Sequence, residues 1–270
     1  MTDVTQGIRP PFPGRRRHPY TRRVSAPPPV VVLIPVKAFA RAKSRLAASL
    51  DPAQRAQLAR SMATTVVRAA APLPVTVVCD DDDVAAWATS VGASVEMTPG
   101  VGLNGAVTEA VDRLRARGVA RVVIAHGDLP FARSFERFAP GAPDDLAPRP
   151  ANGVVIVPDR RRSGTNVLSV PTDSGFRFAY GTGSLDLHLA EAHRLGLPTE
   201  VWSLDDLGWD VDEPEDLDVP EHLGRLDPTG LSEPPESPDP GAGAPGADPS
   251  PAVDPPPRAQ PSPNDRRSTR

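Results

Sequence analysis

The sequence predicts an α/β fold: a mixed, mostly parallel sheet with helices on both faces. Runs of β-branched residues, beginning at Val30–Val36, recur along the 270-residue chain. Segments with a helical apolar period lie between these runs, as after Asp51-Pro52. Strands that alternate with helical segments of roughly 10–15 residues are typical of βαβ units, in which consecutive strands lie parallel.

The first expected strand is Val30–Val36, because an unbroken run of mostly β-branched residues fits a strand buried on both faces. Asp51 and Pro52 predict the start of the first helix, as an N-cap residue followed by proline at the first helical position. Apolar patterning then predicts strands at 75–79 and 95–97, and helices at 80–91 and 104–117.

The second half of the chain continues the alternation. Valine-rich and isoleucine-rich runs predict strands at 121–126, 154–157, 167–170 and 199–202. The sequence also predicts a helix at 185–195 and a final helical turn at 214–217. With no internal repeat, these elements predict one domain of residues 30–226.

Both ends of the chain differ from this domain in composition. Of the 35 prolines, 7 lie in residues 1–29 and 13 in residues 228–270. Neither end has a periodic apolar pattern, so neither can bury enough surface to offset chain entropy. The sequence predicts a disordered, basic, proline-rich tail at 1–29 and a disordered proline-rich tail at 227–270. The prolines also disfavour the amphipathic helix of a transit peptide.

Composition disfavours several classes of function. A net charge of −4 disfavours general nucleic-acid binding, and a single cysteine, Cys79, allows no disulfide within one chain. Cys79 ends an apolar run, and we expect it to be a small buried residue. No apolar stretch has the length of a membrane span or a signal peptide, so we expect a cytoplasmic protein that binds neither nucleic acid nor membrane.

Four cations follow the first expected strand within nine residues: Lys37, Arg41, Lys43 and Arg45. Ligands of open α/β sheets bind at the carboxyl ends of the strands. This loop is therefore a candidate phosphate site that acts through side-chain charge; the alternative is a solvated basic loop. The glycine-rich fingerprint of dinucleotide-binding proteins and the P-loop are both absent from the sequence.

Acidic residues stand at two places where a cation would bind. Asp128 follows the expected strand 121–126, where a divalent cation would bridge the carboxylate and phosphate oxygens. Asp210 and Asp212 share one side of an extended segment, and two such carboxylates repel unless a cation lies between them. The alternatives are a turn cap for Asp128 and an acidic first helical turn after Asp212, which leaves Asp210 unexplained.

Two clusters of glycine and hydroxyl residues suggest a second anion site. They are Ser163–Asn166 and Tyr180–Ser184, the latter directly before the expected helix 185–195. Glycines let backbone N–H groups approach an anion, and a helix N-terminus adds its dipole. The alternative for Ser184 is an ordinary N-cap serine.

These motifs together resemble the CofC/FbiD family of guanylyltransferases in coenzyme F-420 biosynthesis. The resemblance covers about residues 30–220. It rests on eight motifs: Ile34-Pro35-Val36-Lys37, Arg41-Ala42-Lys43-Ser44-Arg45-Leu46, Gly102-Leu103-Asn104, Asp128-Leu129-Pro130, Pro158-Asp159-Arg160, Gly164-Thr165-Asn166, Gly181-x-Gly183-Ser184 and Asp210-Val211-Asp212-x-Pro214-Glu215-Asp216-Leu217.

The resemblance implies a single-domain nucleotidyltransferase fold, like that of nucleotide-diphospho-sugar transferases, with GTP and Mg²⁺ as partners. It implies that Lys37 and Lys43 hold the triphosphate and that Arg41 and Lys43 stabilise charge as it develops. The remaining roles that it implies are the nucleoside site for Gly102, Leu103 and Asn104, the metal ligands Asp128 and Asp212, and the site of a phosphorylated three-carbon acid for Thr165, Gly181 and Ser184.

The reaction implied by the resemblance is transfer of GMP from GTP to phosphoenolpyruvate, which gives enolpyruvyl-2-diphospho-5'-guanosine and pyrophosphate. A downstream enzyme would accept the unstable product. Tyr180 and Thr182 replace the phenylalanine and proline often found in the family's acceptor motif, so 2-phospho-L-lactate stays open as the acceptor. Another alternative is a non-catalytic nucleotide-binding scaffold with tails that recruit partners.

Overall fold

A computed structural model of the chain describes residues 30–139, 152–224 and 226. The predicted tails at 1–29 and 227–270 lie outside the described residues, so their disorder stays a prediction. Among the described residues, no helix combines the length and apolar character needed to cross a membrane.

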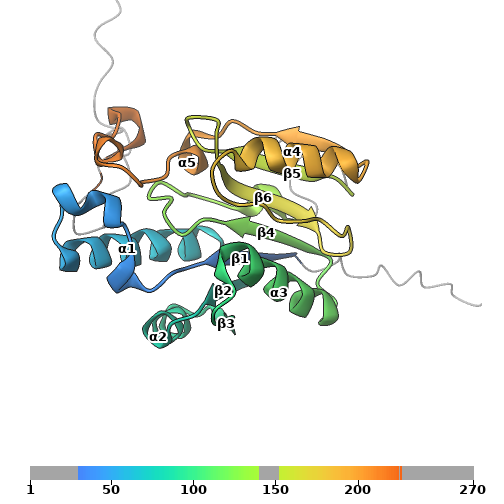
Figure 1. Ribbon diagram of the computed structural model, residues 1–270, viewed down its shortest axis with the longest axis horizontal. Helices are drawn as coiled ribbons and strands as arrows, with labels where there is room; N and C mark the ends of the chain where they lie inside the picture. Colours follow the sequence, from blue (N-terminus) through green and yellow to red (C-terminus); the bar gives the residue numbers. More distant parts are fainter. Residues whose placement is uncertain (1–29, 140–151, 225, 227–270) are drawn as a thin grey trace, which may run out of the picture. The chain divides into compact units, whose positions relative to one another are not determined.

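One seven-stranded sheet forms the centre of the described domain, in the order β3-β2-β1-β4-β6-β5-β7 (Figure 1). Its strands are β1 Val30–Pro35, β2 Val75–Cys79, β3 Ser94–Met97, β4 Arg121–Ala125, β5 Val154–Pro158, β6 Thr165–Pro171 and β7 Thr199–Val201. The α-helices are α1 Pro52–Ala69, α2 Asp82–Ser90, α3 Gly102–Ala116, α4 Ser184–Arg194 and the short α5 Asp205–Gly208. Short 3₁₀ helices are η1 Phe39–Arg41, η2 Ser44–Ala48, η3 Glu136–Phe138, η5 Pro214–Leu217 and η6 Glu221–Leu223.

The sheet is mixed and mostly parallel, as predicted. Only β6 is antiparallel, to both β4 and β5, while the other paired strands are parallel. The sequence analysis did not say which strand departs from the parallel arrangement. The short connection 159–164 places that departure at β6, because a parallel crossover needs about a dozen residues or more.

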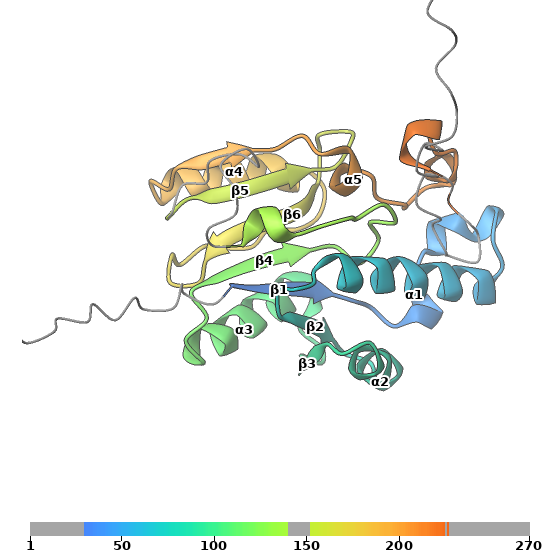
Figure 2. The ribbon, with the colours of Figure 1, turned by 180° about the vertical axis from the view of Figure 1, so that it is seen from behind.

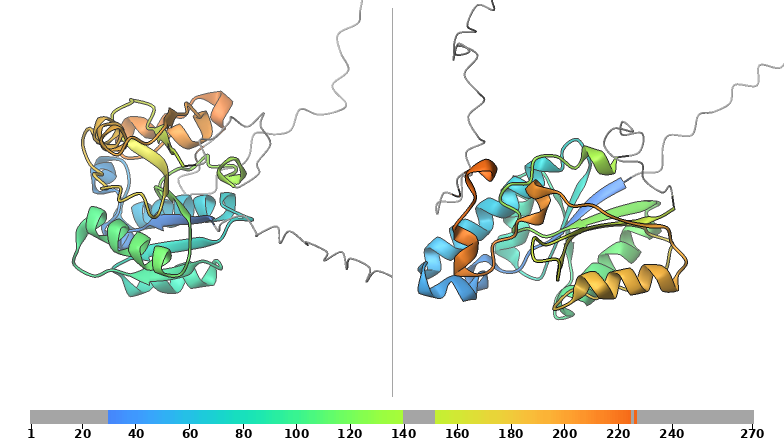
Figure 3. Two further views of the ribbon diagram at one scale, coloured as in Figure 1. Left: turned by 90° about the vertical axis from the view of Figure 1, so that its right-hand side faces the viewer. Right: turned by 90° about the horizontal axis from the view of Figure 1, so that it is seen from above.

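The two faces of the sheet bury different helices (Figures 2 and 3). Val32 and Ile34 of β1 pack on the side of α1 and α2, with Val66 and Trp87. The alternate residues of β1 pack on the side of α3 and α4, as Leu33 does with Val111. Because helices cover both faces of the sheet, all of these alternating side chains are buried, and the first strand is therefore continuously apolar.

Local signals place the helices as expected. The Asp51 carboxylate accepts a hydrogen bond from the Gln54 N–H, and the Gln54 side chain accepts one from the Asp51 N–H, which together form a capping box. Pro52 occupies the first turn of α1. Cys79, at the end of β2, is a buried free thiol, which confirms the expected small buried residue.

Because β1, β2 and β4 are parallel, their carboxyl ends lie at one edge of the sheet. The antiparallel strand β6 begins at this same edge, at Thr165. Residues that follow β1 and β4 therefore meet residues that precede β6. This arrangement gathers the basic loop, Asp128 and Thr165 in one region of the domain.

The fold predicts a large cost for truncating the central strand. Leu33 of β1 is fully buried, so Leu33→Ala is expected to lower the free energy of unfolding by about 2–5 kcal/mol. Leu187→Ala in α4 is the matched control, because its side chain is half exposed and its loss leaves no cavity. Urea unfolding of both variants measures the difference, and equal costs would contradict this description of the core.

Candidate active site

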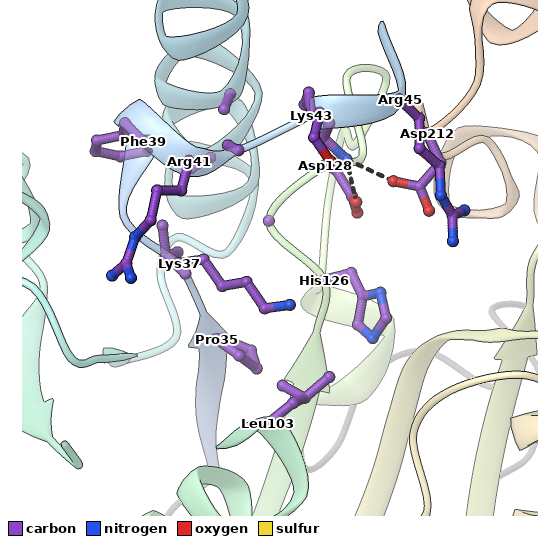
Figure 4. Close-up of a pocket in the computed structure, with 16 residues that line it drawn as sticks. Pro35, Lys37, Phe39, Arg41, Lys43, Arg45, Leu103, His126, Asp128 and Asp212 are labelled. Atoms are coloured by element: carbon purple, nitrogen blue, oxygen red, sulfur yellow. Dashed lines mark hydrogen bonds and ion pairs between the residues drawn. The ribbon is translucent and has the colours of Figure 1, made fainter. Parts of the chain in front are cut away.

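A pocket of about 420 Å³ opens at the carboxyl edge of the sheet (Figure 4). It is lined by the loop that follows β1, by Leu103 of α3, by His126–Asp128 after β4, and by Asp212. The sequence brings these segments together because each follows or faces the end of a parallel strand. The pocket is the candidate active site.

Lys43 lies between two carboxylates in this pocket. Its Nζ donates to Asp128 Oδ2 at 2.6 Å and to Asp212 Oδ1 at 2.9 Å, and the Lys43 side chain is only 9% exposed. Burial alone would lower the pKa of Lys43, but the charges of Asp128 and Asp212 raise it above its ordinary value. The ammonium therefore stays charged and joins the basic loop to two acidic segments.

The backbone of Lys43 is in the left-handed region, with φ of 53°. This conformation is uncommon for a residue other than glycine and costs free energy. It separates η1 from η2, and the loop turns there. The two ion pairs of the side chain offset that cost.

Asp128 keeps its negative charge despite burial. Burial would raise the pKa of the carboxyl group, but Lys43 and then His126 lower it below its ordinary value. Its second oxygen, Oδ1, is buried, and no described residue donates a hydrogen bond to it. A buried carboxylate oxygen without a donor is a position where a cation would bind.

Asp210 is a third acid near this pair, and it is buried. Burial and then the charge of Asp128 raise the pKa of Asp210 to about 6, with smaller contributions from Asp212 and Asp159. Asp210 Oδ1 is also buried without a donor in the described part of the chain. No cluster of three or more His, Cys, Asp or Glu arranged to hold a metal occurs in the described residues.

Asp216 supports the segment that carries Asp212. Its fully buried carboxylate accepts from the N–H groups of Asp212 and Glu213, at 2.7 and 2.8 Å, and pairs with Arg160 and Arg161. Burial would raise the pKa of Asp216, but these partners, Arg160 foremost, lower it to about 2. The sequence analysis gave Asp216 no supporting role, because its burial depends on arginines about 55 residues earlier.

The other three cations of the basic loop, Lys37, Arg41 and Arg45, differ from Lys43 in what they contact. Lys37 and Arg41 line the 420 Å³ pocket, and Figure 4 shows Arg41 pointing away from the Lys43 carboxylate pair. Arg45 pairs with Glu213 at 3.0 Å, where both side chains are well exposed. Arg160 lies over the Trp209 ring at 4.1 Å besides its contact with Asp216, so it has a structural role.

A second pocket of about 250 Å³ adjoins the first, since both are lined by Lys37, Arg41 and Leu103. Gly102 and Asp80 also line it. The residues that line it also include Thr98, whose buried hydroxyl oxygen has no hydrogen-bond partner among the described residues.

Asn104 lines neither of these two pockets. Its side-chain oxygen accepts from the Tyr180 N–H at 2.7 Å, and its amide nitrogen donates to the Tyr180 carbonyl at 3.1 Å. Asn104 thus fixes the start of the segment 180–184. The nucleoside role implied for Asn104 stays a prediction.

The predicted acceptor residues Thr165 and Ser184 are both buried, while Gly181 is exposed. They lie outside the residues that line the 420 Å³ pocket. The backbone N–H groups of Ser163 and Gly164 both donate to the Asp159 carboxylate, at 2.8 and 2.9 Å, so they are not free to bind another anion. The Asp159 carboxylate thus accepts the backbone hydrogen bonds that a bound anion would otherwise accept. The second anion site suggested by the two clusters stays a prediction.

The sequence analysis missed His188 of α4. This fully buried imidazole lies 3.0 Å from Thr165 Oγ1 through Nδ1, and its Nε2 accepts from the Ala179 N–H at 3.1 Å. Burial lowers the pKa of His188 to about 4. His126 is linked to this group through Tyr180, whose ring contacts both histidines. In the sequence, the one signal for His188 is its position one helical turn after Ser184.

The sheet carries a cationic pocket and two carboxylates at the carboxyl ends of its parallel strands, and its fold is that of solved nucleotidyltransferases. A solved nucleotidyl transferase from Methanothermobacter shares the fold, with a TM-score of 0.51 at 16% identity over 72% of this chain and 97% of the other.

The family can be stated more narrowly. A family model described as guanylyl transferase CofC like matches residues 30–220. A phosphoenolpyruvate guanylyltransferase of Sphaerobacter thermophilus is 34% identical over 69% of this chain and 89% of its own length. One of Rubrobacter xylanophilus is 36% identical over 69% and 91%. The chain belongs to this guanylyltransferase family and is an enzyme.

His188 makes the stability of the domain depend on pH. The pKa of His188 is lower in the folded state than in the unfolded state, so the unfolded chain binds more protons between pH 4 and 6.5, and stability falls as pH falls through that range. We expect His188 to account for a loss of about 2 kcal/mol between pH 6.5 and 4.5. Urea unfolding of His188→Asn at both pH values should lack this component; an equal pH dependence would contradict the assignment.

Proposed function

We propose that the enzyme transfers GMP from GTP to phosphoenolpyruvate, giving enolpyruvyl-2-diphospho-5'-guanosine and pyrophosphate, in coenzyme F-420 biosynthesis. The observation that carries this proposal is the buried Lys43 ammonium between Asp128 and Asp212 in a pocket that Lys37 and Arg41 also line. The names of the relatives, phosphoenolpyruvate guanylyltransferase, support the choice of acceptor.

The two adjoining pockets suit the two parts of GTP. The triphosphate would lie in the 420 Å³ pocket against Lys37 and Lys43, which neutralise its charge. The guanosine would lie in the 250 Å³ pocket against Gly102 and Leu103. Of the donors and acceptors lining it, Thr98 has a hydroxyl that the described protein leaves unpartnered.

The carboxylates fit a divalent cation. Asp128 Oδ1 is buried without a donor, and Mg²⁺ favours one or two carboxylates together with substrate phosphates. Asp128 and Asp212 would hold the ion, with Asp210 beside them. When bound, Mg²⁺ would supply positive charge that offsets the triphosphate.

The proposed reaction requires alignment of the two substrates more than it requires a general base. A phosphate oxygen of phosphoenolpyruvate bonds to the α-phosphorus of GTP while the bond from the α-phosphorus to the bridging oxygen breaks, and pyrophosphate leaves with that electron pair. The attacking phosphate is already anionic, so no proton must be removed first. Lys37, Arg41 and Lys43 would hold the oxygens and stabilise the charge that develops.

The acceptor would bind at Thr165, Gly181 and Ser184. Thr165 begins β6, and Gly181 and Ser184 lie at the start of α4. His188 of α4 contacts Thr165, and Asn104 of α3 holds the backbone of Tyr180. Phosphoenolpyruvate carries two anionic groups and no base or sugar, so small donor groups suit it. The runner-up acceptor, 2-phospho-L-lactate, has the same two groups.

Pyrophosphate release tests the proposed function. The full-length enzyme with GTP and Mg²⁺ is expected to release pyrophosphate with phosphoenolpyruvate and more slowly with 2-phospho-L-lactate. Release only with 2-phospho-L-lactate would replace the acceptor, and release with neither acid would overturn the proposal.

The carboxylate pair is expected to be essential for turnover. Asp128→Asn and Asp212→Asn should each lower kcat on the order of 10²-fold or more, because they remove charge where the ion and triphosphate meet. Asp112→Asn, on the exposed face of α3, is the control and should have ordinary activity. EDTA should abolish activity and Mg²⁺ should restore it; activity that persists in EDTA would contradict the metal assignment.

Ser184 is expected to affect the acceptor and not the nucleotide. Ser184→Ala removes one hydroxyl donor to an anion, so the KM for phosphoenolpyruvate should rise about tenfold while the KM for GTP stays nearly unchanged. Lys43→Gln should instead raise the KM for GTP. Initial rates of pyrophosphate release measure both constants, and the reverse pattern would show that the two substrate sites are interchanged.

A further inference from the structure

His188 makes two hydrogen bonds that fix where its proton lies. The Ala179 N–H donates to Nε2 at 3.1 Å, so Nε2 offers a lone pair and carries no proton. The neutral ring then has its proton on Nδ1, which lies 3.0 Å from Thr165 Oγ1. His188 is therefore the donor and the Thr165 oxygen is the acceptor.

The ring has little freedom to change this arrangement. His188 is fully buried, and the Tyr180 ring packs against it in an edge-to-face contact with centroids 4.8 Å apart. The Phe176 ring lies at 5.8 Å. Burial also keeps the imidazole neutral, since its pKa is about 4.

The hydrogen bond from His188 decides what Thr165 can do. A hydroxyl has one proton and two lone pairs, and His188 occupies one lone pair. The Thr165 proton thus points away from His188 and is available to another acceptor. The phosphate and carboxylate groups of the proposed acceptor can only accept hydrogen bonds, so a hydroxyl that binds them must donate.

We propose that His188 is a positioning residue, which turns the Thr165 hydroxyl so that its proton is donated to the anionic acceptor. The inference rests on the proposed function, because it takes Thr165 as an acceptor-binding residue. His188 touches no reacting atom in this account. It acts through Thr165 and, at Ala179, holds the segment that leads to Gly181 and Ser184.

The wild-type enzyme offers a first test that needs no variant to fold. In protein labelled with ¹⁵N-histidine, the His188 resonances are expected to show the Nδ1–H tautomer at pH 7. The resonance of that proton should shift on addition of phosphoenolpyruvate more than on addition of GTP. The spectrum of His188→Asn assigns His188 among the five histidines. An Nε2–H tautomer would overturn the proposal.

Two variants separate the two hydrogen bonds of His188. The amide of His188→Asn reaches about as far as Nδ1 and can still donate to Thr165, whereas the amide of His188→Gln reaches about as far as Nε2 and can still accept from Ala179. If His188 orients Thr165, His188→Gln should raise the KM for phosphoenolpyruvate about tenfold, with kcat and the KM for GTP changed less than about twofold. His188→Asn should rescue most of that loss. A larger effect for His188→Asn than for His188→Gln would overturn the proposal.

Thr165→Val distinguishes this inference from the proposed function. It should raise the KM for phosphoenolpyruvate at least as much as His188→Gln, and the double variant should be no worse than Thr165→Val alone. If Thr165→Val raises the KM and His188→Gln does not, the role of His188 is wrong while the acceptor site stands. If Thr165→Val leaves the KM unchanged in an active enzyme, both the acceptor assignment of Thr165 and the inference fail.

Discussion

The ion pairs of Lys43 are the interaction on which the site depends. One ammonium joins three parts of the chain that are distant in sequence: the loop after β1, the loop after β4 and the segment around Asp212. The Lys43 side chain is only 9% exposed, so its charge is stable only while its partners remain ionised. Asp128 raises the pKa of Lys43, and Lys43 lowers the pKa of Asp128, so both groups stay charged. The same contact would place Lys43 and the two carboxylates around the triphosphate of the nucleotide.

Hydrogen bonds and ion pairs of other polar side chains hold the segments around this site in place. Asp216 holds the backbone of Asp212 and Glu213, and it is held in turn by Arg160 and Arg161. Asn104 and His188 bind the backbone of Tyr180 and Ala179 and so fix the segment that leads to Ser184. Buried polar side chains thus position the backbones of the segments that form the site.

The sequence predicted the strands and helices well because each has a local signal. The apolar runs of β1 and β4 and the capping residues of α1 lie where they were expected. It also predicted that the basic loop and Asp128 share one edge, which follows from parallel strands. The direction of β6 was not predictable from composition, since a short connection decides it. His188 and Asp216 were missed because their roles come from partners far along the chain, where local patterns carry no information.

The most direct test of this account is the coupling between Lys43 and its two carboxylates, measured by urea unfolding in EDTA. Lys43→Met in the wild-type background leaves two partly buried carboxylates without their counter-ion. Lys43→Met in an Asp128→Asn, Asp212→Asn background leaves neutral groups. We expect the substitution to cost at least about 1 kcal/mol less in the second background. Equal costs in the two backgrounds would show that the ion pairs do not join these segments and would contradict the account.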